Sequence, residues 1–428
     1  MASFDISVPA VLVRLDRNPF HHGTLGAVRS LGRAGIAVHA VIESARSPVA
    51  RSRYLRDTTV AEDAEHLRAL LPRISERLGT PAVLVPLDDL SAISLARLGP
   101  ELAGRYLRPE QPSGLPERVA DKAELAGICA TLGLPHPRTA VPGDHEEAAR
   151  AAWALGLPVV AKWSRPWLLP KGSGLRSTVV VRSPREAREL YARSAEAGSR
   201  LLLQELLPPG RDLDWFFHGY SGADGTLLVG ATGRKERAWP AGAGLTAVGR
   251  WLPNPAVERL AGRVVAALGY RGILDLDFRL DAATGAYHLL DFNPRPGAQF
   301  RLFTDPSGTD VVRALHLDLT GRPVPALVPA YGRTFVVENY APLSALPSGR
   351  GRGRGARRTA AAGTERAWFA RDDPRPAYAM TAAWLRHAAR VGARRLKPRR
   401  PAAPPKALLS GVRQRRRAPD SATPPVPH

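Results

Sequence analysis

The chain has 428 residues, a formal net charge of +22 and a single cysteine, Cys129. This length allows two or three domains with a large hydrophobic core. One cysteine excludes an intrachain disulfide and a metal cluster built from cysteines. No apolar run reaches the roughly 18 residues that a membrane-spanning helix needs. The N-terminus has no basic segment before its apolar stretch, so we expect no secretory signal and a cytoplasmic protein without membrane contact.

The positive charge is concentrated near the C-terminus. Residues 349–428 contain 20 of the 61 Lys and Arg residues but only 4 of the 39 Asp and Glu residues. The composition there is rich in Gly, Arg, Ala and Pro, which predicts a flexible basic tail with one helix near 376–396. This helix carries one tryptophan, Trp384, and few aromatic side chains for stacking on bases. We therefore do not expect nucleic acid as a partner, although the tail alone has the charge for backbone electrostatics.

The first 115 residues alternate between strand and helix patterns. Strands are expected at 9–15, 36–42 and 82–87, and helices are expected to begin at His22 and to cover 61–79. This alternation predicts a doubly wound parallel sheet, with ligand-binding loops at the carboxyl ends of its strands. The side chains of those loops suit polar substrates: Arg17, His21, His22, Asp88 and Asp89.

The rest of the body mixes shorter strands with helices, which is typical of an α+β region. The expected helices cover 117–134, 144–156, 184–197, 254–268 and 308–319. The expected strands cover 158–163, 177–182, 201–207, 215–221 and 227–235, followed by a hairpin over 275–293.

The two strands of that hairpin carry acids. Asp277 lies on the first strand, Asp291 ends the second, and Asn293 follows two residues later. A tight turn at 281–285 would bring these three side chains together. Oxygen ligands without His or Cys suit Mg²⁺, with Mn²⁺ as an alternative. Asp275 shares the face of Asp277 on a strand, so either acid can be the first ligand.

Features typical of nucleotide binding lie upstream of the hairpin. The loop Gly172-Ser173-Gly174, preceded by Lys171, can turn backbone N–H groups toward a phosphate. Lys162 ends a buried strand, where a lysine is costly unless it meets an anion. The strand that ends in Gln204-Glu205-Leu206-Leu207 stops at a Pro-Pro-Gly turn, which leaves backbone groups for an adenine edge. Asp212, beyond that turn, can accept ribose hydroxyls.

The order of these motifs resembles that of the ATP-grasp superfamily over about residues 8–320. The opening segment 11–41 is similar to the D-aspartate ligase-like, predicted carboligase branch of carboxylate–amine ligases. The second metal-binding acid is more often Glu in this superfamily, whereas Asp291 is one methylene shorter. The resemblance implies an α/β pre-ATP-grasp domain at 1–115, a two-subdomain ATP-grasp fold at 116–325 divided near 140–205 and 206–325, and a C-terminal extension at 326–428.

The resemblance also implies roles for individual residues. ATP phosphates would contact Lys162, and the loop with Lys171, Gly172, Ser173 and Gly174 would close over them. Adenine would be read beside Gln204 by the backbone of Glu205 and Leu207, and ribose would be bound by Asp212. Asp277, Asp291 and Asn293 would hold one or two Mg²⁺, with Asp277 favoured over Asp275. Arg295 would act as the catalytic residue that faces the transferred phosphoryl group.

Other residues have competing interpretations. Lys122 is either a second nucleotide-binding lysine or an exposed helix residue, and Lys235 is either a phosphate contact or a solvated strand end. Arg295 is either catalytic or a surface arginine of a loop. Arg301 is a candidate for binding the acceptor carboxylate.

The resemblance implies an enzyme that phosphorylates a small carboxylate or amino acid with ATP and joins it to an amine, forming an amide. One alternative uses the acylphosphate for carboxylation or thioester formation. Another is an inactive ATP-binding module that its basic tail docks on an acidic partner or nucleic acid. The expected partners are small-molecule carboxylate and amine substrates; the oligomeric state stays open, with a homodimer as one candidate.

Overall fold

The computed structural model describes residues 3–170, 172–208, 210–240, 244–344 and 363–396, of which 391–396 are described by their backbone only. Residues 1–384 form one compact unit, and residues 385–428 form a second. Among the described residues, no helix combines the length and the apolar character that crossing a membrane requires.

The N-terminal region is built on a parallel sheet in the order β3-β2-β1-β4-β5. Its strands are β1 (Ala10–Val13), β2 (Val38–Ile42), β3 (Leu55–Val60), β4 (Ala82–Pro86) and β5 (Tyr106–Leu107). β1 pairs in parallel with both β2 and β4, which confirms the doubly wound arrangement. β3 and β5 were not predicted, because β3 has no fully buried position and β5 has only two residues.

Helices cover both faces of this sheet. The apolar side chains of α1 (His22–Arg33) pack on one face, in a core that also includes α11 (Val311–Leu319). Those of α2 (Ala64–Leu78) and α3 (Asp89–Arg97) pack on the other. Two short helices, η1 (Pro48–Arg51) and α4 (Gly99–Leu102), lie in the connections. The strand–helix alternation of the sequence therefore becomes a three-layer α/β region.

The helix predicted over 117–134 is in fact two helices, α5 (Leu115–Ala120) and α6 (Lys122–Thr131). Asp121 separates them with extended backbone angles, and its side chain accepts hydrogen bonds from the N–H groups of Ala123 (3.0 Å) and Glu124 (3.2 Å). This N-cap competes successfully with helix continuation. As a consequence, Lys122 is the first residue of α6.

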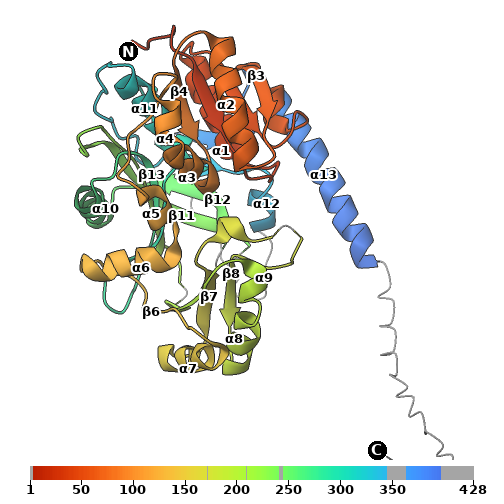
Figure 1. The fold of residues 1–428 in the computed structure, drawn as a ribbon, viewed down its shortest axis with the longest axis vertical. Coiled ribbons are helices and arrows are strands. Elements are labelled where there is room, and N and C mark those ends of the chain that lie inside the picture. Colours follow the sequence, from red (N-terminus) through yellow and green to blue (C-terminus); the bar gives the residue numbers. More distant parts are fainter. Residues whose placement is uncertain (1–2, 171, 209, 241–243, 345–362, 397–428) are drawn as a thin grey trace, which may run out of the picture. The chain divides into compact units, whose positions relative to one another are not determined.

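A four-stranded antiparallel sheet follows, in the order β6-β9-β7-β8. Its strands are β6 (Thr139–Ala140), β7 (Val159–Trp163), β8 (Thr178–Val181) and β9 (Leu201–Glu205). Figure 1 shows α7 (His145–Leu155) and α8 (Pro184–Tyr191) beside this sheet, with which they share an apolar core. Two shorter helices, η2 (Pro166–Leu168) and α9 (Ser194–Ala197), complete this smaller subdomain.

The largest sheet has the order β14-β13-β10-β11-β12-β15-β16. Its strands are β10 (Asp214–Ser221), β11 (Leu227–Trp239), β12 (Leu245–Trp251), β13 (Gly272–Leu280), β14 (Tyr287–Asn293), β15 (Thr334–Val336) and β16 (Thr364–Arg366). One face packs against α5, α6 and α10 (Pro255–Leu268). The other face packs against α11 and η3 (Phe300–Phe303), in the same core as α1.

The C-terminal region differs from the expected extension that begins at residue 326. β15, α12 (Ala341–Ser344), β16 and the first part of α13 (Arg375–Leu396) belong to the compact unit 1–384. Trp368 is fully buried, and Asp373 forms an ion pair of 3.0 Å with Arg29 of α1. Residues 345–362 and 397–428, where we expected low complexity, lie outside the described residues.

Candidate active site

The β13–β14 hairpin brings the predicted oxygen ligands to one face of the large sheet. Asp277 pairs with Asp291, and Asp275 pairs with Asn293, in the antiparallel register. Opposed residues on antiparallel strands share a face, as do residues two positions apart on one strand. The four side chains therefore lie as neighbours, in the arrangement that the sequence predicted.

β11 adds a lysine to this face. Asp277 pairs with Phe216 on β10, and Phe216 in turn pairs with Gly233 on β11. Lys235 is two residues beyond Gly233 and therefore shares its face. Arg234 alternates to the other face, so only Lys235 of these two cations lies with the acids.

Two lysines from different subdomains meet at Asp291. Lys122, at the start of α6, donates a hydrogen bond to Oδ1 of Asp291. Lys162, on β7, places its Nζ 3.5 Å from the same oxygen and 3.4 Å from the carbonyl oxygen of Leu290. Burial would raise the pKa of Asp291, but the two ammonium groups hold it at about 2. Burial lowers the pKa of Lys162 although Asp291 opposes this. The anion that the buried Lys162 meets in this structure is the carboxylate of Asp291, and its contact with phosphate stays a prediction.

Asp275 and Asp277 have different surroundings. Asp275 lies 3.0 Å from Nε2 of His218 and 3.0 Å from Nη1 of Arg295, and it accepts a hydrogen bond of 3.2 Å from Asn293. Burial would raise the pKa of Asp275, but His218 and Arg295 lower it overall. Among the described side chains, Asp277 has no hydrogen bond or ion pair. Its pKa is raised to about 6 by burial and by the neighbouring carboxylates, against the opposing charge of Lys235.

These residues fit a divalent cation such as Mg²⁺. No three His, Cys, Asp or Glu side chains are grouped to hold a metal in the described part of the chain, so the candidate ligands are two acids and one amide. Asp277 offers an unpartnered carboxylate directly opposite Asp291. The side-chain oxygen of Asn293 lies on the same face. A hard, all-oxygen donor set of this kind suits Mg²⁺ and would relieve the repulsion between the two carboxylates.

Arg295 is held between two carboxylates rather than exposed in a surface loop. Its Nη1 lies 3.0 Å from Asp275, and its Nε lies 3.2 Å from Asp89 at the first turn of α3. Burial would lower the pKa of Arg295, but Asp89 and Asp275 raise it overall. In the described residues its Nη2 has no hydrogen-bond partner, so this amino group remains available for an anion.

The predicted phosphate loop lies in the smaller subdomain. Gly172 and Gly174 have φ of 80° and 73°, in the left-handed region that favours glycine. Ser173 stabilises the loop locally, because its hydroxyl accepts from the N–H of Leu175 (3.2 Å) and its carbonyl accepts from Arg193 (3.0 Å). Lys171 lies outside the described residues. No contact between this loop and the acids of the hairpin is found among the described residues.

The predicted adenine and ribose residues surround the end of β9. Gln204 is buried and donates a hydrogen bond of 2.9 Å to Thr139. Glu205 already has hydrogen-bond partners, because its N–H donates to the carbonyl of Arg138 and its carboxylate accepts from Arg138. Leu207 is buried and has no backbone hydrogen bond within the described residues. Asp212 is 57% exposed and lies 3.3 Å from Arg234.

Two candidates for substrate binding have other partners in the structure. Arg301 is buried and ion-paired with Glu365 of β16, and its contact with an acceptor carboxylate stays untested. His22 is buried against Phe335, with a ring-centroid distance of 5.7 Å, instead of facing a loop. Glu365 was not predicted as a partner of Arg301, because it lies far along the chain in a region expected to be flexible.

His218 is the site residue that sequence reasoning missed. It occupies the apolar strand 215–221, where a single histidine is unexpected. It lies directly opposite Asp275 in the sheet register, and its Nε2 is 3.0 Å from that carboxylate.

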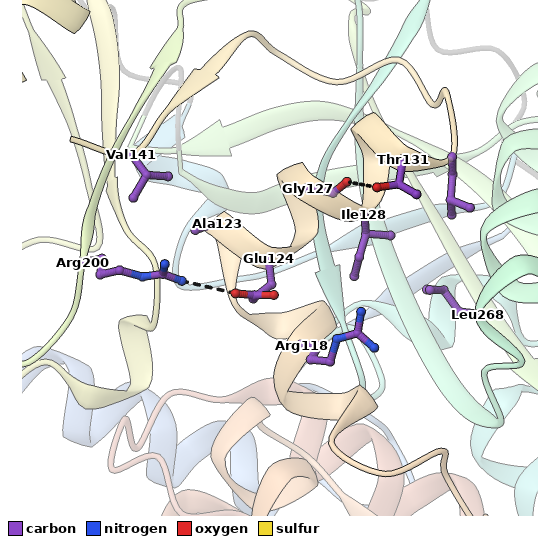
Figure 2. Close-up of a pocket in the computed structure, with 10 residues that line it drawn as sticks. Arg118, Ala123, Glu124, Gly127, Ile128, Thr131, Val141, Arg200 and Leu268 are labelled. Atoms are coloured by element: carbon purple, nitrogen blue, oxygen red, sulfur yellow. Dashed lines mark hydrogen bonds and ion pairs between the residues drawn. The ribbon is translucent and has the colours of Figure 1, made fainter. Parts of the chain in front are cut away.

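A separate pocket of about 470 Å³ lies beside α6 (Figure 2). Its lining includes Arg118, Ile128, Val141, Arg200 and Leu268, and Arg200 lies 3.4 Å from Glu124. None of the predicted site residues lines this pocket, so it is not the site described above.

Comparison with known proteins connects this geometry to a fold. No family model matches the chain. The carbamoyl phosphate synthase large chain of Myxococcus xanthus is 23% identical over 275 residues, which is 59% of this chain but 24% of that protein. That of Deinococcus deserti is 29% identical over 225 residues, 50% of this chain and 20% of the relative. The chain therefore spans about a quarter or less of the length of these relatives.

Solved structures agree at the level of the fold. N5-carboxyaminoimidazole ribonucleotide synthetase from Thermus thermophilus has a TM-score of 0.55 and 17% identity, covering 75% of this chain and 80% of that one. The biotin carboxylase domain of Hydrogenobacter thermophilus 2-oxoglutarate carboxylase, solved with MgADP and bicarbonate, has a TM-score of 0.55 and 19% identity, covering 74% and 71%. The chain therefore shares the fold of these structures, which agrees with the two-subdomain fold that the order of its motifs implies.

Proposed function

We propose that the protein is an ATP- and Mg²⁺-dependent ligase that joins a small carboxylate or amino acid to an amine by way of an acylphosphate. The observation that carries this proposal is the convergence of Lys122 and Lys162 on Asp291, beside the unpartnered carboxylate of Asp277. Ammonium groups and carboxylates gathered at one point match the opposite charges of nucleotide phosphates and a divalent cation.

The nucleotide would lie between the smaller subdomain and the large sheet. Lys122 and Lys162 would exchange Asp291 for phosphate oxygens, and Lys235 would add charge from β11. The loop with Lys171, Gly172, Ser173 and Gly174 would cover the phosphates. The strand end at Gln204, Glu205 and Leu207 would contact adenine, and Asp212 would contact ribose.

In the proposed reaction, a carboxylate oxygen of the donor attacks the γ-phosphorus of ATP. The bond between that phosphorus and the bridging oxygen breaks, which releases ADP and forms an acylphosphate. The amine nitrogen then attacks the acyl carbon, the carbon–oxygen bond to phosphate breaks, and the nitrogen loses a proton. The chain needs no nucleophilic side chain for these steps, because positioning and charge neutralisation are sufficient.

Individual residues would perform this neutralisation. The free Nη2 of Arg295 would face the transferred phosphoryl group, which makes Arg295 the proposed catalytic residue. Asp277, Asp291 and Asn293 would hold Mg²⁺, which supplies charge neutralisation for phosphate oxygens when it is bound. The lysines would supply the remaining positive charge without a proton transfer of their own.

The comparisons also favour a second candidate, carboxylation. Two of the structural neighbours are an N5-carboxyaminoimidazole ribonucleotide synthetase and a biotin carboxylase domain, the latter solved with bicarbonate. In that case bicarbonate would be the carboxylate that is phosphorylated. The same neighbour is described as a dimer, so a homodimer of this chain is a further proposal that sedimentation would test.

The first experiment is to measure ADP and phosphate release from Mg·ATP with pools of carboxylates and amines, with and without bicarbonate. Asp291→Asn and Asp318→Asn would be compared, because Asp318 binds Tyr220 away from the acids of the hairpin. Release that needs a carboxylate, an amine and Asp291 supports the ligase, whereas release that needs bicarbonate supports carboxylation. No release, together with no binding of Mg·ADP, contradicts both.

A further inference from the structure

We infer that Asp275 is a positioning residue that fixes the orientation of two functional side chains, Asn293 and Arg295, and that His218 holds Asp275 in place. The inference rests on the proposed function, because the roles of Asn293 and Arg295 come from it. Asp275 itself would touch neither the cation nor the nucleotide.

The amide of Asn293 has one permitted orientation. Its Nδ2 donates to both the side-chain Oδ2 and the backbone oxygen of Asp275, at 3.2 Å each. Rotating the amide by 180° would place its oxygen against these two oxygens, which is repulsive. Asp275 therefore keeps the Oδ1 of Asn293 turned away from itself, as a metal-binding oxygen requires. A carboxylate that orients a ligand in this way is typical of the outer shell of metal sites.

The same carboxylate oxygen also aligns Arg295. Oδ2 of Asp275 lies 3.0 Å from Nη1, while Asp89 from the N-terminal region lies 3.2 Å from Nε. Two contacts on different nitrogens fix the plane of the guanidinium group. The amino group left over is Nη2, so Asp275 and Asp89 together determine which donor an anionic substrate group meets.

His218 anchors Asp275 from the other side. Its Nε2 lies 3.0 Å from Oδ1 of Asp275, and its ring is fully buried against Phe216 and Phe303, at centroid distances of 5.4 and 5.1 Å. Gly297 closes over this pair: a Cβ there would lie 2.4 Å from Cε1 of His218. The aromatic packing and the glycine confine the His218 ring beside Asp275.

These contacts also distinguish Asp275 from the proposed metal ligands. Oδ2 of Asp275 already accepts hydrogen bonds from Arg295 and Asn293, and Oδ1 lies 3.0 Å from Nε2 of His218. Asp277 has no such partner among the described residues. Asp275 thus acts through its neighbours.

The test uses Mn²⁺ as a probe, measured by the loss of its free electron paramagnetic resonance signal with ADP present, beside ADP affinity without metal. Asp275→Leu keeps the shape of the side chain but removes both acceptors, Asp275→Asn keeps one acceptor oxygen, and Asp318→Asn is the matched control. We expect Asp275→Leu to weaken Mn²⁺ binding by about 10- to 100-fold. Asp275→Asn should weaken it less, while metal-free ADP affinity and the control stay within about twofold.

The outcomes separate this inference from the proposed function. If the wild type retains Mn²⁺ with ADP and Asp275→Leu, folded by circular dichroism, retains it equally well, the positioning role is overturned and the proposed function stands. If Asp275→Leu does not fold, Asp275→Asn decides, and unchanged Mn²⁺ affinity in that variant overturns the inference. If Asp275→Leu loses metal-free ADP binding to the same extent, its effect is structural, which also overturns it. A wild type that binds neither Mn²⁺ nor ADP contradicts both proposals.

Discussion

Removing the carboxylate of Asp373 should destabilise the C-terminal segment far more than removing that of its neighbour Asp372. Arg29 and Asp373 have side chains that are 0% and 1% exposed, with Nε and Oδ2 3.0 Å apart. Asp373 also accepts hydrogen bonds from the hydroxyl of Ser52 (2.7 Å) and the N–H of Arg53 (3.0 Å). Asp373→Ala would leave a guanidinium charge, a hydroxyl and an amide without this acceptor in a dry environment.

The magnitude follows from burial. Breaking a buried ion pair by removing one partner costs about 3–5 kcal/mol, because the other charge stays uncompensated. Asp372 accepts two hydrogen bonds of 2.8 Å from Arg33 and one of 2.6 Å from Tyr54, but the side chains of Asp372 and Arg33 are 41% and 28% exposed. An exposed pair contributes about 0–1 kcal/mol. Two adjacent Asp→Ala substitutions should therefore differ by about 3 kcal/mol.

The assay is native-state hydrogen exchange of amides in α1 and in residues 364–384, beside urea unfolding, because such segments can open locally. Arg29→Met combined with Asp373→Leu should recover most of the lost stability, since neither side chain is then charged. Equal, small losses for Asp373→Ala and Asp372→Ala would refute the reasoning, because they would mean that water reaches Arg29. A double variant no more stable than Asp373→Ala would assign the loss to packing instead.

Three further predictions concern the site and the core. Lys162→Ala should weaken Mg·ADP binding by about 10- to 100-fold, since hydrogen bonds to charged groups contribute about 1.5–3 kcal/mol. Calorimetry that shows unchanged affinity would contradict the proposed contact between Lys162 and the phosphates. Gly297→Ala should lower the unfolding free energy by about 1–3 kcal/mol, because the added methyl group overpacks against His218. Gly127→Ala on α6 should raise it by about 0.5–1 kcal/mol, because a Cβ there meets no atom within 4 Å. Thermal unfolding that shifts both variants in the same direction would disprove this. Burial lowers the pKa of His22 to about 4 from 6.5. Its contribution to stability is therefore complete above pH 6.5 and is lost as the pH falls toward 4, by about 3 kcal/mol at most. His22→Leu should flatten the dependence of unfolding free energy on pH over this window, and an identical slope in both proteins would exclude His22 as the cause.

The parts of the site that sequence could predict are those set by local rules. The hairpin follows from a turn at 281–285 between two strands, and its register then places Asp277 opposite Asp291. The position of Lys122 depends on a helix break at Asp121, which is a favoured N-cap residue, so the signal was present but was overridden by the helical pattern on both sides.

Contacts between segments that are distant in the sequence could not be predicted from a local sequence pattern. Asp373 is 344 residues from Arg29, and the segment that carries it follows a stretch of low complexity. The composition of that stretch indicated flexibility, but the following segment is fixed by burial of Trp368 and by a charge partner on α1. Local secondary-structure propensity cannot predict an interaction partner that comes into contact only through tertiary packing.

Three aspartates of similar local sequence have different chemistry here because their charges are compensated to different degrees. Asp275 faces His218 and Arg295, which fix it as an anchor. Asp291 faces two lysines, whose ammonium groups we propose would also contact phosphates when a nucleotide is bound. Asp277 faces no cation at contact distance among the described residues, so burial raises its pKa and makes it the carboxylate that gains most from a divalent ion. We therefore base the proposed roles of Asp275, Asp277 and Asp291 on the environment of each acid more than on its position in the motif.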